Sequence, residues 1–131
     1  TLAGEVLMLE RAEPRGFWQS VTGSLHEGES AIAAAKRELE EETGLLGEPL
    51  ETDLSNTYPI IPAWRARYAP DVTHNHETVF VFPLEDPCEV HLSPLEHVCQ
   101  IWLPREQAAN KASSWTNREA ILNLVPDGAF T

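Results

Sequence analysis

The sequence is short of cysteine and of long apolar runs, and each shortage argues against a class of protein. Its two cysteines, Cys88 and Cys99, are too few for a disulfide scaffold and lack C-x-x-C spacing. We expect both as free, partly buried thiols in a reducing compartment. No apolar run approaches the roughly 18 residues of a membrane helix, and no signal-peptide pattern is present. We therefore expect a cytoplasmic protein without a membrane partner.

Basic residues are also scarce, since Lys and Arg number 9 against 21 Asp and Glu, a formal net charge of −12. This balance argues against binding of nucleic acid through its phosphates and against a polybasic membrane anchor. The 131 residues are 42% hydrophobic and 23% charged, without repeats or a Gly/Ser linker. The composition predicts one folded domain over residues 1–131. Because Thr1 stands first rather than Met, we expect the natural start to lie upstream.

Strand-like segments alternate with turn signals along the chain. Short apolar stretches bounded by turn residues predict strands at residues 5–11, 17–21, 50–57, 77–84 and 97–103. Two other stretches are typical of loops: residues 23–29, which contain two glycines, and the proline-marked residues 58–62.

Helix signals occur once early and twice late in the chain. Residues 31–43 are rich in good helix formers, with Ser30 as a candidate cap and Gly44 as a natural stop. Pro104 can open a short helix at its first position. A last helix is expected from about Ser114 to Leu124, capped by Ser113 or Ser114. Together with the strands, these helices predict an α/β fold with a sheet packed between helices.

The early helix carries an acidic face. At about 100° per residue, Glu38, Glu41 and Glu42 fall within roughly a 100° arc, beside an arc that packs on the core. Lys36 and Glu40 point toward solvent. Like charges at this spacing repel, whereas a hard divalent cation such as Mg²⁺ would bind the three carboxylates together. On the helix alone, a solvated acidic face remains the alternative interpretation.

The residues around this helix decide between the two interpretations. Gly23 and Gly28 have P-loop spacing, but Glu29 follows where a P-loop requires Lys, so that motif is excluded. The remaining pattern is Gly23, then Glu29 after five residues, then, after seven more, Arg37-Glu38-Leu39-x-Glu41-Glu42-x-Gly44-Leu45. This spacing resembles the Nudix box, and on it the chain is identified as a member of the Nudix hydrolase family.

The resemblance implies a Nudix fold, a mixed β-sheet sandwiched between helices (α/β/α), although the family's usual strand before residues 5–11 is absent here or not included in this sequence. It also implies a loop–helix–loop that binds metal and a diphosphate. Glu38 and Glu42 would be metal ligands, and Glu41 would be a further ligand or would polarise the attacking water. Structural roles would belong to Gly23, Glu29, Arg37 and Gly44, with Glu29 and Arg37 as an internal ion pair.

The reaction that the resemblance implies is attack of water on a phosphorus of a diphosphate-containing substrate. Mg²⁺, with Mn²⁺ as a possible substitute, would neutralise the phosphate oxygens and lower the pKa of the water. A bridging cation also explains how a protein of charge −12 binds a polyphosphate.

Three stretches outside the box, residues 17–24, 67–77 and 114–118, are similar to the bacterial Nudix hydrolases of dihydroneopterin triphosphate. That similarity implies release of pyrophosphate and formation of dihydroneopterin monophosphate. Glu96 would be an extra metal ligand or the catalytic base. Substrate contacts would come from Arg11, Thr22, Pro59, Ile60, Ile61, Pro62 and Ser114.

Several alternatives remain open at this stage. Arg11 is equally typical of a surface cation, Glu96 of an exposed loop acid, and Ser114 of a plain helix cap. His74 and His76 are two residues apart, but no third His or Cys stands at a zinc-site spacing. The substrate could also be dATP or another nucleoside triphosphate. A binding module that senses such a molecule without hydrolysis would be favoured by a degenerate box, and this box is complete.

Overall fold

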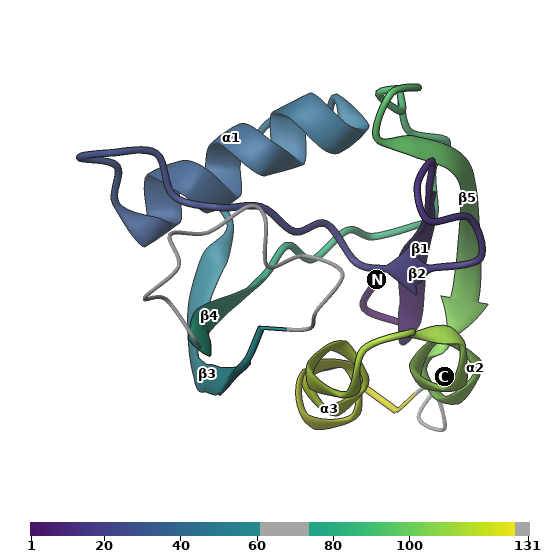
Figure 1. Cartoon of the computed structure of the whole chain (residues 1–131). Helices are drawn as coiled ribbons and strands as arrows, with labels where there is room; N and C mark the ends of the chain where they lie inside the picture. The colour runs from purple at the N-terminus through teal and green to yellow at the C-terminus, as the bar shows by residue number, and fades with distance from the viewer. Residues whose placement is uncertain (61–73, 128–131) are drawn as a thin grey trace.

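The computed structural model describes residues 1–60 and 74–127. Within these residues, the strands form a three-stranded and a two-stranded sheet. In Figure 1 the strands lie between helix α1 (Ala31–Thr43) on one side and helices α2 (Arg105–Lys111) and α3 (Trp115–Leu124) on the other. None of the helices in this part of the chain has the length and apolar character needed to cross a membrane.

Strand β1 (Glu5–Arg11) is the centre of the larger sheet, whose order is β2-β1-β5. Strand β5 (His97–Pro104) pairs antiparallel with it from one end to the other, with Arg11 opposite His97. Strand β2 (Trp18–Gln19) pairs along the other edge of β1, with Leu9 opposite Gln19. Gln19 and His97 therefore lie on the two strands that flank the C-terminal half of β1.

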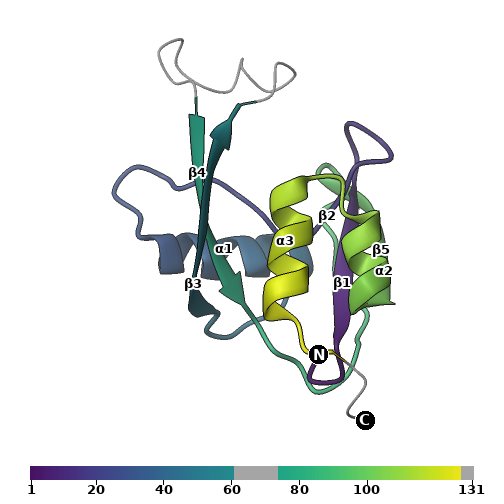
Figure 2. The ribbon, with the colours of Figure 1, turned by 90° about the horizontal axis from the view of Figure 1, so that it is seen from below.

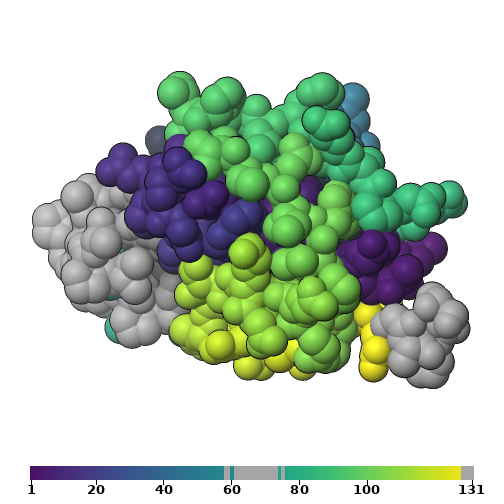
Figure 3. All heavy atoms as spheres, turned by 90° about the vertical axis from the view of Figure 1, so that its right-hand side faces the viewer, coloured from purple at the N-terminus to yellow at the C-terminus, as the bar shows by residue number. Residues whose placement is uncertain are grey.

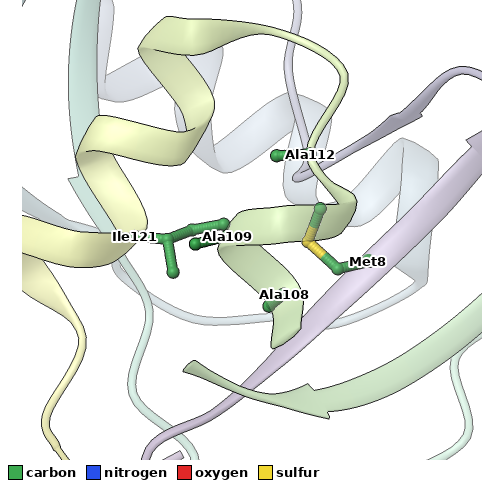
Figure 4. Close-up of a cluster of buried hydrophobic side chains, with 5 residues drawn as sticks. All are labelled: Met8, Ala108, Ala109, Ala112 and Ile121. Carbon is green, nitrogen blue, oxygen red and sulfur yellow. The ribbon is translucent and has the colours of Figure 1, made fainter. Parts of the chain in front are cut away.

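The buried apolar cluster lies between β1 and the two C-terminal helices (Figure 4). It consists of Met8, Ala108, Ala109, Ala112 and Ile121. The three alanines allow helix α2 to approach the sheet closely, and Met8 and Ile121 supply most of the buried volume. Truncation of either large side chain to alanine should cost about 2–5 kcal/mol of stability.

Strands β3 (Leu50–Pro59) and β4 (His74–Val81) form the second sheet as an antiparallel pair. Seen from below in Figure 2, α1 runs across this pair, and the pair lies beside α3. On the face drawn in Figure 3, purple N-terminal residues lie between green residues and the yellow-green residues of the C-terminal part of the chain. Ala12 N donates to the Glu96 carbonyl at 2.8 Å, so the residue after β1 lies against the residue before β5.

The sequence predictions for the elements are confirmed in most places. The α/β class, the early helix over residues 31–43 and the strand over residues 5–11 are as expected. The last helix begins at Trp115 and is capped by Ser114. Pro104 ends β5 and precedes α2, so it lies one residue before the position predicted for it.

Other predictions need correction. The described strands pair only antiparallel and in two sheets, where a mixed sheet was expected. Strand β2 stops at Gln19 because the next amide, that of Ser20, donates to Asn117 Oδ1 at 2.8 Å. Strand β4 begins at His74 and ends at Val81, not at residues 77 and 84, and the Leu84 carbonyl instead accepts from Leu2 N at 3.1 Å. Cys88 and Cys99 are free as expected, but both are exposed.

Candidate active site

Helix α1 positions the acidic residues. Ser30 Oγ accepts a hydrogen bond from Ala33 N at 3.3 Å and so caps the first turn. Gly44 ends the helix in the left-handed region, at a φ of 76°, where glycine is favoured because it has no β-carbon. Its N–H donates to the Glu40 carbonyl at 2.8 Å.

The three acids of the helix differ sharply in burial. Their side chains are 52% exposed at Glu41, 14% at Glu38 and 2% at Glu42. The sequence placed all three on one face beside the core, whereas the structure puts Glu42 inside the protein. The interior surrounding Glu42 therefore belongs to the candidate site.

Arg37 ties the helix to the loop before it. Its Nε donates to Glu29 Oε2 at 2.8 Å and its Nη2 donates to Glu29 Oε1 at 3.0 Å, a two-point ion pair. Nη2 also donates to the Ser24 carbonyl at 2.9 Å. The guanidinium thus fixes both a side chain and the backbone of the loop.

The remaining nitrogen of Arg37 faces the helix. Nη1 donates to Glu38 and also to Glu41, the latter at 3.2 Å. These contacts with Glu29 and Glu38 raise the pKa of Arg37. In return, Arg37, aided by the His26 N–H, lowers the pKa of Glu29 to about 2. One guanidinium therefore contacts three carboxylates and keeps Glu29 ionised.

Gly23 is required by a close approach rather than by its backbone angle. A β-carbon at this position would lie 2.2 Å from the carboxyl carbon of Glu38. Because no φ in the left-handed region is found here, the requirement comes from the Glu38 carboxylate alone. Any side chain at position 23 would displace that carboxylate.

The start of β5 completes the site from the other side. His97 is buried, with its side chain 2% exposed, and its Nδ1 lies 3.5 Å from Glu42 Oε1. Glu96 is exposed beside it and offers a carboxylate oxygen to the same group. Ligand atoms of Glu42, Glu96 and His97 all lie within 4.8 Å of one another.

Burial controls the electrostatics of this cluster. Desolvation, a hydrogen bond to Glu38 and the charges of Glu38 and Glu96 raise the pKa of Glu42 to about 9, while the Thr22 N–H acts in the opposite direction. Burial also lowers the pKa of His97, with a smaller contribution from the charge of Arg11. The protein alone thus leaves a crowded set of acids whose repulsion a cation would remove.

The donor set fits a divalent cation. Glu42 Oε2 and His97 Nδ1 are buried, and among the described residues no hydrogen bond reaches either atom. Unsatisfied buried groups of this kind are costly unless a ligand completes them. The available ligands are carboxylate oxygens: Glu42 and its hydrogen-bond partner Glu38 lie on α1, and Glu96 lies just before β5. Mg²⁺ and Mn²⁺ prefer ligands of this kind.

The residues expected to contact the substrate differ in how directly the structure connects them to the acidic cluster. Thr22 lies at the site, since its backbone N–H donates to the Glu42 carboxylate. Arg11 ends β1 opposite His97, and its Nε donates to the Glu13 carbonyl at 2.9 Å. Ser114 Oγ caps α3 by accepting from Asn117 N at 3.1 Å.

The expected substrate contacts at residues 59–62 are described only in part. Ile60 is buried, at 8% exposure. Pro59 ends β3, and nothing is described of its side chain. Ile61 and Pro62 lie outside the described residues. The roles of all four as substrate contacts stay predictions.

Sequence reasoning missed several residues that the structure brings to the site. His97 follows Glu96 directly, and Gln19 Nε2 donates to its Nε2 at 3.0 Å. Asn117 donates from Nδ2 to Ser20 Oγ at 2.9 Å and so ties α3 to the segment that leads to Thr22. One feature of the sequence could have indicated Gln19: it is a polar residue inside the predicted strand at residues 17–21. A buried polar side chain in a packed strand usually has a hydrogen-bond partner.

The fold and the site together define the class of protein. The profile of the NUDIX domain family matches residues 2–124, and the chain belongs to the Nudix family. Nudix hydrolases generally use divalent metals, which agrees with the acidic cluster at Glu42 and Glu96.

Relatives narrow the comparison. The chain is 43% identical over 129 residues to the dihydroneopterin triphosphate diphosphatase of Escherichia coli K12, covering 95% of this chain and 85% of that protein. It is 37% identical over 121 residues to the Haemophilus influenzae protein of the same name, covering 88% and 75%. Among solved structures, it matches that of the Escherichia coli dihydroneopterin triphosphate pyrophosphohydrolase with a TM-score of 0.87 and 38% identity, covering 93% of this chain and 86% of that one.

Proposed function

We propose that this protein hydrolyses dihydroneopterin triphosphate to dihydroneopterin monophosphate and pyrophosphate, with Mg²⁺ or Mn²⁺ as its cofactor. One observation carries the proposal: the identity of 43% to a protein named for this activity extends over 129 residues, well beyond the Nudix box. The arrangement of Glu38, Glu42 and Glu96 around one partly buried site supports the same chemistry.

Glu38 and Glu42 would hold the metal from α1. Glu96 lies near enough to Glu42 to add an oxygen as the substrate binds, and Glu41, on the same helix, would be a further ligand. The bound cation would neutralise the phosphate oxygens and lower the pKa of the attacking water. The chain supplies the placement of these carboxylates. Arg37 fixes Glu38 and Glu41 by its own contacts, and Gly23 leaves the space that the Glu38 carboxylate occupies.

Hydrolysis needs a base for the proton that water loses. Glu41 Oε2 already accepts a hydrogen bond from Arg37 Nη1 at 3.2 Å, so one of its two oxygens is engaged. Glu96 is exposed, lies beside Glu42, and is therefore the better placed base. The water oxygen forms a bond to phosphorus, one P–O–P bond breaks, the proton goes to Glu96, and pyrophosphate leaves.

The substrate would lie across the site from α1 to the start of β5. Thr22 and Arg11 border the acidic cluster, and they are proposed to contact the triphosphate or the adjoining part of the substrate. Ile60, with its neighbours at residues 59–62, would contact the apolar faces of the pterin ring. Ser114 would close the site from the N-terminus of α3.

The test compares two substrates side by side. Purified protein is incubated with dihydroneopterin triphosphate or with dATP in the presence of Mg²⁺, and pyrophosphate release is measured. We expect kcat/KM to favour the pterin by more than about 10-fold. Equal or better turnover of dATP would instead support a nucleoside triphosphate hydrolase, and binding without pyrophosphate release would support a sensing module.

Metal dependence is tested in the same assay. Excess chelator should abolish turnover, and added Mg²⁺ or Mn²⁺ should restore it. A Glu40→Gln variant, which loses one charge on the exposed side of the same helix, is the control and should respond to chelator and metal as the wild type does. Full turnover in excess chelator would contradict the metal role.

A further inference from the structure

Two buried polar groups face each other behind the acidic cluster. Glu42 and His97 both have side chains that are 2% exposed, and Glu42 Oε1 lies 3.5 Å from His97 Nδ1. Within residues 1–60 and 74–127, no hydrogen bond reaches Glu42 Oε2 or His97 Nδ1. A buried imidazole that is directed at a buried carboxylate requires an explanation, because each group loses its hydration on folding.

The second nitrogen of the imidazole is held from across the sheet. Gln19 in β2 reaches over β1 and donates from Nε2 to His97 Nε2 at 3.0 Å. Since an amide NH₂ can only donate, Nε2 of His97 accepts, and the ring proton of the neutral imidazole lies on Nδ1. The same contact requires the neutral imidazole, because an imidazolium would donate from both of its nitrogens.

From this chain of contacts we propose that His97, oriented by Gln19, is a positioning residue that directs the Glu42 carboxylate toward the divalent cation. In the metal-bound protein, the Nδ1–H would close the present 3.5 Å separation and donate to Glu42 Oε1, which would leave Oε2 for the cation. The inference rests on the metal role of Glu42 in the proposed function. It assigns to β2 and β5 a part in a site whose acidic residues lie mainly on α1.

The physical advantage is preorganisation. A glutamate has three side-chain torsions, so a single backbone position does not determine where its carboxylate points. A fixed donor behind one oxygen selects one orientation, and outer partners of this kind typically contribute 10- to 100-fold in metal affinity. Because His97 and Gln19 lie on paired strands, their positions are set by the backbone ladder on both sides of β1.

The competing explanation is that His97 itself binds the cation through Nδ1, since the same atom lies in the group formed with Glu42 and Glu96. Donation from Gln19 to Nε2 argues against it, because the proton then occupies Nδ1 and no lone pair remains there. Ligation by His97 is therefore an outcome that the experiment must distinguish.

The test uses two variants in which an amide group replaces the imidazole and occupies the position of only one of its two nitrogens. In His97→Asn, the amide nitrogen can take the place of Nδ1 and donate to Glu42. In His97→Gln, the amide reaches the Nε2 position near Gln19 but offers no donor to Glu42. Mn²⁺ affinity of the full chain is measured by calorimetry, and the exposed His91→Gln serves as control.

We expect His97→Gln to weaken Mn²⁺ binding by about 10- to 100-fold. The Mn²⁺ affinity of His97→Asn should be close to that of the wild type, and the affinity of Gln19→Met should lie between those of the two His97 variants. Melting temperatures of the metal-free variants separate this effect from unfolding. Equal Mn²⁺ affinity for wild type and His97→Gln would overturn the proposal, as would a directly bound ¹⁴N in the electron spin-echo spectrum of Mn²⁺. If the wild type itself binds no Mn²⁺, the metal role in the proposed function fails instead.

Discussion

Gly23 and the Glu38 carboxylate compete for one small space, since a β-carbon on Gly23 would lie 2.2 Å from Glu38 Cδ. A Gly23→Ala substitution should therefore push the Glu38 carboxylate away from Arg37 and Glu42. We expect turnover to fall by about 10- to 100-fold, as for other changes that misplace a metal ligand. The melting temperature should change little, because position 23 is exposed and its backbone is unstrained.

Steady-state kinetics and thermal melting check this prediction. Ser24→Ala, at the next exposed position, is the matched control because it adds no atom near Glu38. If Gly23→Ala turned over at the wild-type rate, the close approach to Glu38 would have no functional meaning.

Glu42→Gln should separate metal binding from stability. The substitution removes one negative charge with almost no change of shape, so we expect turnover to fall by more than about 100-fold, beyond the range of outer partners. The metal-free variant should melt at the wild-type temperature or above it, because the raised pKa of Glu42 requires this carboxylate to take up a proton on folding at neutral pH, a cost that Gln does not carry. Near wild-type turnover would contradict the assignment of Glu42 as a ligand.

Metal binding should release a proton from Glu42. Because the pKa of this group in the metal-free protein is raised to about 9, it is largely protonated at neutral pH and must ionise to bind a cation. Mn²⁺ affinity should therefore increase between about pH 6 and pH 8. Calorimetry in buffers of different ionisation enthalpy measures the release, which we expect to be about one proton. Glu42→Gln should release none from this position.

The ion pair of Glu29 and Arg37 should make the stability of the folded protein depend on pH in the acidic range. The folded-state pKa of Glu29 is depressed to about 2 from its ordinary value of 4.5, so its contribution is present above pH 4.5 and is lost as the pH falls toward 2. Melting temperatures of wild type and Glu29→Gln should thus differ most near neutral pH and converge at low pH. A constant difference across this range would show that the ion pair is not its source.

Ser114 allows helix capping to be separated from substrate contact. Its hydroxyl accepts from Asn117 N, so Ser114→Ala should cost about 0.5–2 kcal/mol of stability. Ser114→Asp keeps a capping acceptor and should restore the melting temperature, but its negative charge should raise KM for a triphosphate. If Ser114→Asp matched wild type in both measurements, Ser114 would be a cap only.

The early helix shows how far local sequence reaches. Ser30, Gly44 and the helix-forming residues between them act through contacts within a few positions, so its bounds followed from the sequence and agree with the structure. The spacing of Glu38, Glu41 and Glu42 likewise follows from helix geometry alone. Composition and the Nudix box were therefore enough to indicate the family and the acidic helix.

Strand ends depend on distant partners and could not be located in the same way. Strand β2 stops at Gln19 because Asn117, far along the chain, takes the next amide, and β4 is set by its pairing with β3. A single sequence does not reveal which residue supplies such a hydrogen bond.

What the sequence determined by itself was the set of acids and their order on one helix, because helical periodicity is local. Only the tertiary structure decided which acid is buried, and it placed His97 and Glu96 beside Glu42, with Gln19 behind His97. The physical reason is that burial and pKa depend on what packs against a group from other strands, and β2 and β5 meet α1 only in the folded chain.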